Sequence, residues 1–139
     1  MHNSVFQVKA KEHSVSGGVG LATGITVRPG QLLQITADPN DRWSAGVKDR
    51  VSNANGLGNP LGGNYGLHTR GDQSFLYGAL VGSLDGGKTF FGVGTSLTMT
   101  LVTDGKLTLH YWDSNNHDNS GTVRVMVRIY NGPINVNPI

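Results

Sequence analysis

The chain has 139 residues, with 11 Lys and Arg against nine Asp and Glu, and no Cys. This length suits one domain, residues 1–139, which can bury a core without cross-links. The missing cysteines exclude disulfides, thiolate metal sites and cysteine nucleophiles, and the singly scattered basic residues argue against nucleic-acid binding. Charged residues make up only 14% of the chain and glycine occurs 21 times, a composition typical of loop-rich β proteins rather than helical bundles.

The first residues lack a basic start followed by an apolar stretch, and no segment approaches about 18 consecutive apolar residues. We therefore expect no ordinary signal peptide and no membrane insertion. Met1 has the character of a natural start. Synthesis in the cytoplasm is expected, with release to the cell surface or action there left open.

Apolar and polar residues alternate through most of the chain, which is the period of a half-buried β-strand. Turn sequences separate the alternating segments at Arg28-Pro29-Gly30, Asp85-Gly86-Gly87 and Asp104-Gly105, and the last is of the hairpin type. The expected strands span residues 5–10, 24–27, 31–37, 75–84, 89–94, 96–101, 106–112 and 122–129. About eight strands without a helical period predict an all-β fold, a β-sandwich or jelly roll.

The last two expected strands alternate most sharply. Leu107, Leu109 and Tyr111 are predicted to share one face of their strand, with Trp112 on the opposite face. The residues predicted to face the core from the final strand are Val123, Val125, Val127 and Ile129.

Residues 38–73 are rich in glycine, asparagine, proline and charge and show no period. Such a long irregular stretch in a compact domain is either functional or disordered. We favour a functional role, because Trp43, Tyr65 and His68 are distributed through it.

The loop Asp113–Gly121 between the last two expected strands is rich in Asp, Asn and Ser. Calcium takes about six to eight oxygens from carboxylates, amides and carbonyls. Asp113 and Asp118 would balance the charge of a divalent ion, Asn119 would add an amide oxygen, and Asn115 a backbone carbonyl. The same composition also suits an ordinary turn whose side chains bond their own backbone, and the EF-hand spacing is absent.

Further short segments accompany this loop in a fixed order. Gly-Ala-Leu-Val-Gly at 78–82 and Phe-Gly-Val-Gly at 91–94 precede it, and Trp43-Ser44-Ala45-Gly46 and residues 53–57 lie upstream. Their order and spacing, from about Pro29 to Ile129, resemble the PA-I-type (PA-IL-like) calcium-dependent galactophilic lectins, a bacterial family. The resemblance implies a galactose-binding-domain-like β-sandwich, usually a homotetramer, that binds sugar without catalysis.

The resemblance also implies a calcium ligand set. It assigns the side chains of Asp113, Asp118 and Asn119 and the backbone carbonyls of Asn115 and Ala45. Asp118 stands where the family has Asn, which keeps the oxygen and adds a charge. The loop is shorter than the family's.

For the sugar, the resemblance implies two hydroxyls bound directly by calcium. Asp113 and Asp118 would accept hydrogen bonds from these hydroxyls, with the Ser114 backbone beside them. The family's His-Pro-Asp-Gln stretch has no counterpart in the long loop 47–73, so Tyr65 and His68 are the candidate contacts there. Their alternative role is that of ordinary exposed or packed loop residues.

Three other aromatic residues have competing interpretations. Trp43 could stack on a sugar, but its place before the expected carbonyl ligand favours packing. Trp112 is expected either at a subunit interface or beneath the calcium loop. His117 is expected to face solvent near the sugar, because imidazole is a poor calcium ligand.

We therefore expect a calcium-dependent lectin for galactose-type glycans that forms a homo-oligomer, a tetramer or dimer. The alternative is a structural or protein-interaction sandwich whose loop is braced by calcium. An enzyme is not expected, because a glycosidase needs two carboxylates flanking a cleft. The one glutamate, Glu12, is near the amino terminus, and no Gly-x-Ser-x-Gly motif is present.

Overall fold

The computed structural model describes residues 2–131, which form antiparallel β-sheets and one short 3₁₀ helix. The all-β sandwich predicted from the alternating pattern is confirmed. In the described part of the chain, no helix has the length and apolar character needed to cross a membrane. The elements are β1 His2–Lys9, β2 Leu21–Val27, β3 Leu32–Ala37, β4 Trp43–Ser44, η1 Lys48–Arg50, β5 Val51–Ser52, β6 Leu67–Arg70, β7 Gln73–Leu76, β8 Leu80–Ser83, β9 Phe91–Gly92, β10 Ser96–Thr100, β11 Gly105–Tyr111 and β12 Ser120–Tyr130.

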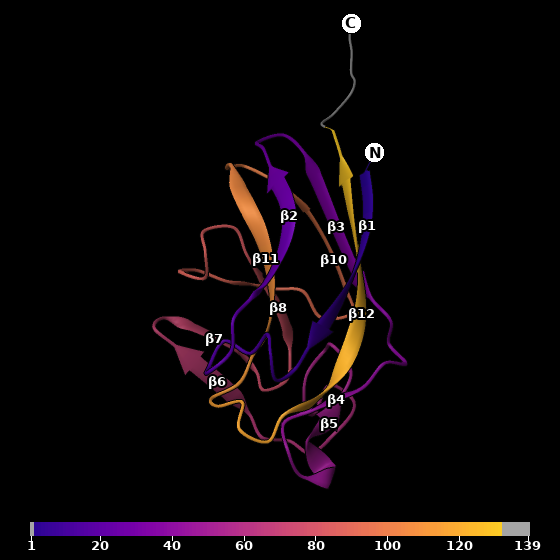
Figure 1. The fold of residues 1–139 in the computed structure, drawn as a ribbon, viewed down its shortest axis with the longest axis vertical. Helices are drawn as coiled ribbons and strands as arrows, with labels where there is room; N and C mark the ends of the chain where they lie inside the picture. Colours follow the sequence, from indigo (N-terminus) through magenta and orange to yellow (C-terminus); the bar gives the residue numbers. More distant parts are fainter. Residues whose placement is uncertain (1, 132–139) are drawn as a thin grey trace, which may run out of the picture.

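Two sheets pack against each other (Figure 1). In the first sheet, β12 pairs with β1 and with β3, which pairs in turn with β10, and β4 and β5 extend the sheet beside the start of β12. The second sheet has the order β2-β11-β8-β9, and β6 and β7 form a separate hairpin. The short strands β4 to β7 gather at one end of the sandwich, whereas β1 begins and β12 ends at the other (Figure 1).

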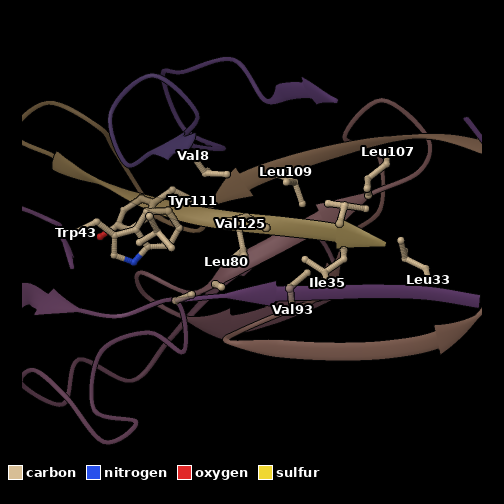
Figure 2. Packing of buried hydrophobic residues seen from close by; sticks show 14 of the residues in the cluster. Val8, Leu33, Ile35, Trp43, Leu80, Val93, Leu107, Leu109, Tyr111 and Val125 are labelled. Carbon is tan, nitrogen blue, oxygen red and sulfur yellow. The ribbon is translucent and has the colours of Figure 1, made fainter. Parts of the chain in front are cut away.

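The core lies between the two sheets and is built from every second residue of the long strands (Figure 2). Leu107, Leu109 and Tyr111 face it from β11, as predicted, and none is more than 1% exposed. The predicted core face of β12 is also confirmed, with Val123, Val125, Val127 and Ile129 all buried. Each large buried apolar side chain contributes about 1.5–3 kcal/mol, so this seam holds firmly the two strands that flank the loop Asp113–Gly121.

A second apolar cluster lies on the opposite face of β8 and β11. Trp112 is fully buried there with Ala79 and Val81, and Phe75 from β7 packs against it. The indole Nε1 of Trp112 donates to the His68 carbonyl at 2.7 Å, which attaches the hairpin β6–β7 to the sandwich. Because Trp112 is buried within one chain, it does not lie at a subunit interface.

The prediction of one continuous strand over residues 75–84 is wrong. The chain turns between β7 and β8, where Gly78 has a φ of 81°. A Cβ at Gly78 would lie 3.1 Å from the Ser52 hydroxyl and 3.3 Å from the Tyr111 hydroxyl. Apolar alternation continues on both sides of this turn, so the sequence pattern conceals it.

The prediction of a hairpin at Asp104-Gly105 is also wrong. β10 pairs with β3 in the first sheet, whereas β11 pairs with β2 and β8 in the second, so the chain crosses between sheets at this turn.

The expected strand 89–94 is reduced to β9. The loop before it is held by Gln73, whose side chain donates to the Phe90 carbonyl at 2.6 Å and accepts from the Phe90 amide at 2.8 Å.

Residues 38–73 contain short elements that the sequence pattern did not predict, namely β4, η1, β5 and β6. The pairing of β4 with β12 places Ser44 opposite Ser120 and Trp43 opposite Gly121, next to the loop Asp113–Gly121. Trp43 is 1% exposed and its ring centroid lies 4.6 Å from that of Tyr111. The packing role predicted for Trp43 is therefore confirmed.

His110 is a buried titratable residue on the outer face of β11. It is 7% exposed, its Nε2 lies 2.8 Å from the Thr108 hydroxyl, and its ring centroid lies 5.1 Å from that of Phe90. Burial, with smaller contributions from the charges of His13 and Arg70, lowers the pKa of His110 from 6.5 to about 4. Protonation therefore favours the unfolded chain.

The stability due to neutral His110 is fully present above pH 6.5 and is lost as the pH falls towards 4. We expect this residue to account for a loss of about 2 kcal/mol between pH 8 and pH 5. Urea unfolding in chelator should show that His110→Gln removes this part of the pH dependence. Thr108→Val, which keeps the imidazole, should retain it, and an unchanged pH slope in His110→Gln would contradict the assignment.

Candidate functional site

A pocket of about 600 Å³ is formed by side chains from three separate parts of the chain. Its volume is typical of small-ligand sites, which span about 300–1,000 Å³. The loop Asp113–Gly121 supplies half of its lining, and the irregular stretch after β3 supplies most of the rest. The lining residues are Ala45, Arg50, Leu57, Tyr65, Tyr77, Asp113, Ser114, Asn115, His117 and Asp118.

Asp113 lies two residues after the end of β11 and is only 5% exposed. Its Oδ1 accepts a hydrogen bond from the Ser114 amide at 2.7 Å, and its backbone carbonyl accepts one from the Ser16 hydroxyl at 2.7 Å. Its Oδ2 is buried without a hydrogen-bond partner among the described residues. Burial raises the pKa of the Asp113 carboxyl, against opposing contributions from Asn119 and from loop amides.

Asn119 is also 5% exposed. Its Nδ2 donates to the Ala10 carbonyl at 3.0 Å, which orients the amide, and its backbone amide donates to the Asn116 carbonyl at 3.2 Å. The amide oxygen Oδ1 is buried and has no partner within residues 2–131. Buried polar atoms are nearly always paired with protein groups or ordered water, so the free acceptors on Asp113 and Asn119 are places where a cation or a water molecule would be stabilised.

Asp118 and Gly46 come into direct contact. A Cβ built at Gly46 would collide with the Asp118 carboxylate, and Gly46 has a φ of 127°. The φ favours glycine at this position, and a larger residue would displace the Asp118 carboxylate. The preceding residue, Ala45, is buried and lines the pocket, so the expected carbonyl segment lies beside the expected carboxylate.

Asn115 is exposed and lines the pocket. Its side-chain oxygen accepts a hydrogen bond from the His117 amide at 3.2 Å. This bond engages the side chain within the loop, and the backbone carbonyl of Asn115 as a metal ligand stays a prediction. Ser114 and His117 are exposed along the same pocket.

The donor set matches the chemistry of calcium better than that of a transition metal. Within the described residues, no group of three or more His, Asp or Glu side chains could hold a metal ion. The pocket instead contains the carboxylates of Asp113 and Asp118, and the expected further donors are the amide of Asn119, which is not in the lining, and the carbonyls of Ala45 and Asn115. Calcium accepts this mixture of oxygens in flexible geometry, so the residues present fit this ion.

The two candidate sugar contacts of the long loop lie in different places. Tyr65 lines the pocket and its hydroxyl donates to Asp49 at 2.7 Å. His68 is half-buried and does not line the pocket. Its ring centroid lies 5.3 Å from that of Tyr77 and 5.6 Å from that of Trp112.

The sequence did not single out Arg50, Leu57 or Tyr77, which complete the pocket. Arg50 and Leu57 come from the stretch without a period, and Tyr77 from the unpredicted turn before β8. The aromatic residues scattered through 38–73 were the available signal that this stretch contributes to a site. No periodic pattern could indicate which of its side chains reach the pocket.

The chain matches no family model and no curated protein. Among solved structures, it is similar to one described as "EclA N-terminal domain; PllA-like lectin". The TM-score is 0.64 at 22% sequence identity, over 91% of this chain and 95% of that chain. The similarity thus extends over nearly the whole of both chains and shows a shared β-sandwich fold.

Proposed function

We propose that this chain is a calcium-dependent carbohydrate-binding protein. The observation that carries the proposal is the pair of buried, unpartnered oxygens, Oδ2 of Asp113 and Oδ1 of Asn119, beside an open pocket. Burying a carboxylate oxygen without a partner is costly, and a bound cation would offset that cost. Asp118 and the carbonyls of Ala45 and Asn115 would complete the ligand set.

The pocket is suited to a sugar because it places hydrogen-bond acceptors beside apolar surface. Bound calcium would supply coordination positions that two neighbouring sugar hydroxyls can take in place of water. Asp113 and Asp118 would accept hydrogen bonds from those hydroxyls and so orient the ring. Leu57, Tyr65 and Tyr77 would contact its less polar face.

Galactose-type glycans are the sugars proposed first, on the resemblance of the calcium loop. The described lectin domain with a similar fold supports carbohydrate binding in general. A homo-oligomer, as the resemblance implies, would present several such sites and raise avidity for a glycan-bearing surface.

Calorimetry with calcium, followed by a glycan array and galactose titration with and without chelator, tests this function. We expect calcium binding without sugar, and sugar binding only with calcium. Sugar binding that survives chelation would contradict the metal-bridged mechanism.

A calcium-braced structural domain is the second candidate. It is favoured by the bonds that fasten the loop to residues 10–17, from Asn119 to Ala10, Asn116 to Lys11 and Ser16 to Asp113. An ion joining these segments would stabilise the fold without any sugar. A thermal shift with calcium, combined with an empty glycan array, would select this function.

A further inference from the structure

Arg50 is the one Lys or Arg side chain that lines the pocket within the described residues. It ends η1, and its backbone carbonyl accepts a hydrogen bond from the Ala45 amide at 2.9 Å. This bond ties the position of Arg50 to the segment expected to supply a calcium ligand. The guanidinium and the calcium loop therefore belong to the same pocket.

The guanidinium is positioned by Tyr65. Its Cζ lies 5.0 Å from the centroid of the Tyr65 ring, within the range of a cation–π contact. The Tyr65 hydroxyl is itself held by Asp49 at 2.7 Å. A planar cation fixed against an aromatic ring loses less freedom on binding a ligand than a mobile one.

Arg50 nevertheless has no salt-bridge partner among the residues that the structure describes. The single ion pair found in residues 2–131 joins Lys9 to Glu12. The Nε of Arg50 is buried and has no hydrogen-bond partner in this part of the chain. The guanidinium of an arginine stays protonated in proteins. Arg50 thus stays charged and has donors left to offer.

The charges of the pocket become unbalanced when calcium is bound. Asp113 and Asp118 are the two carboxylates in the lining, and together they balance one divalent ion. Arg50 then remains as a positive charge in the same pocket. Asp49 lies outside the lining, and the hydrogen bond from the Tyr65 hydroxyl does not cancel its charge, but no salt bridge joins it to Arg50 within residues 2–131.

We propose that the pocket prefers glycans carrying a negatively charged group, a carboxylate or a sulfate, which Arg50 binds while neighbouring hydroxyls meet the calcium site. This inference rests on the proposed carbohydrate-binding function and specifies its substrate class. The guanidinium fork matches both groups, because it can donate two parallel hydrogen bonds to a carboxylate or sulfate. The volume of about 600 Å³ leaves room for such a substituent beside the ring.

The test compares methyl galactoside with methyl galacturonide and with 6-O-sulfated methyl galactoside by calorimetry in calcium. We expect at least one acidic ligand to bind about tenfold more tightly than the neutral one, which corresponds to about 1.4 kcal/mol. The carboxylate and sulfate arms identify which group is preferred. The preference should shrink as salt is raised, because the Arg50 side chain is partly open to solvent.

Three variants assign the preference to Arg50. Arg50→Gln should lower the affinity for the acidic ligand about tenfold more than for the neutral one, and Arg50→Lys should keep part of the difference. Lys48→Gln removes a cation from the same short helix but outside the pocket, and it should retain the full preference. Calcium titration of each variant verifies that the metal site is intact.

The calorimetric results separate the preference for acidic glycans from the carbohydrate function as a whole. Equal or weaker binding of both acidic ligands by the wild type would overturn it and leave the carbohydrate function standing. An equal loss for neutral and acidic ligands in Arg50→Gln would show that Arg50 only shapes the pocket. Calcium binding without affinity for any of the three ligands, together with an empty glycan array, would refute the carbohydrate function itself.

Discussion

Replacing Asp113 by asparagine is expected to abolish calcium binding and to leave the calcium-free domain as stable as the wild type or more so. Asparagine keeps an oxygen to accept the Ser114 amide bond but removes the buried charge. The expected fall in calcium affinity is at least a hundredfold, or about 2.7 kcal/mol. A calcium concentration that stabilises the wild type by a similar amount should then stabilise the variant by less than about 0.5 kcal/mol.

The sign of the stability change follows from the raised pKa of Asp113. A carboxyl whose pKa is raised in the folded state contributes stability below its unfolded pKa and loses it as the pH rises through the folded value. At neutral pH without metal, the ionised group is therefore unfavourable, and its removal should gain up to about 1–3 kcal/mol.

Calorimetry and thermal melts in calcium and in chelator measure both effects of Asp113→Asn. Asp72→Asn is the matched control, because Asp72 is exposed in the turn of the hairpin β6–β7 and does not line the pocket. The control should bind calcium like the wild type. Calcium affinity within tenfold of the wild type in Asp113→Asn would show that this carboxylate is not a ligand.

Replacing Trp112 by alanine is expected to destabilise the domain by about 3–5 kcal/mol, the range for deleting a large buried aromatic side chain. Trp112 is fully buried, and its ring centroid lies 5.0 Å from that of Phe75 and 5.2 Å from that of Phe90. It also holds the hairpin β6–β7 through its bond to the His68 carbonyl. The loss should be accompanied by proteolysis of the hairpin before the rest of the sandwich.

Trp112→Phe separates packing from hydrogen bonding. Phenylalanine keeps most of the apolar contact but leaves the His68 carbonyl without its donor, so a cost of about 1–3 kcal/mol is expected. Urea unfolding measures both variants, and limited proteolysis reports on the hairpin. A cost below about 1 kcal/mol for Trp112→Ala would show that the second cluster contributes little to stability.

Trp112 links this cluster to the site because it directly precedes Asp113. The side chains at the end of β11 therefore pack on opposite faces. Tyr111 packs in the main core, and Trp112 packs beneath the hairpin β6–β7. The two residues hold the backbone from both sides where the loop Asp113–Gly121 begins. Small losses of packing at Trp112 should consequently lower calcium affinity as well as stability.

The alternating pattern alone determined much of the fold. The faces of β11 and β12 were predicted correctly because side-chain direction in a strand is a local property with a period of two. Strand pairing is not local, and the sequence pattern mistook a crossover between sheets at Asp104-Gly105 for a hairpin. It also missed the turn at Gly78, because apolar residues continue on both sides of it.

The oxygen-rich chemistry of the loop Asp113–Gly121 was likewise evident from sequence, since the residue types themselves define the possible donors. The resemblance added Ala45, and the structure brings Ala45, Asp113, Asn115 and Asp118 to one pocket. Their role as calcium ligands stays a prediction. The burial that leaves Asp113 and Asn119 with unpartnered oxygens could be seen only in three dimensions.

The remaining walls of the pocket were decided by tertiary structure. Arg50 and Tyr65 reach the site because β4 pairs with the start of β12 and draws the following stretch alongside the loop. His68 is directed away from the lining by its packing against Tyr77 and Trp112. Contacts between segments far apart in the chain leave no period in either segment. The sequence by itself could therefore indicate the oxygen donors of a candidate ion site, but only the folded chain places the Arg50 guanidinium in the same pocket.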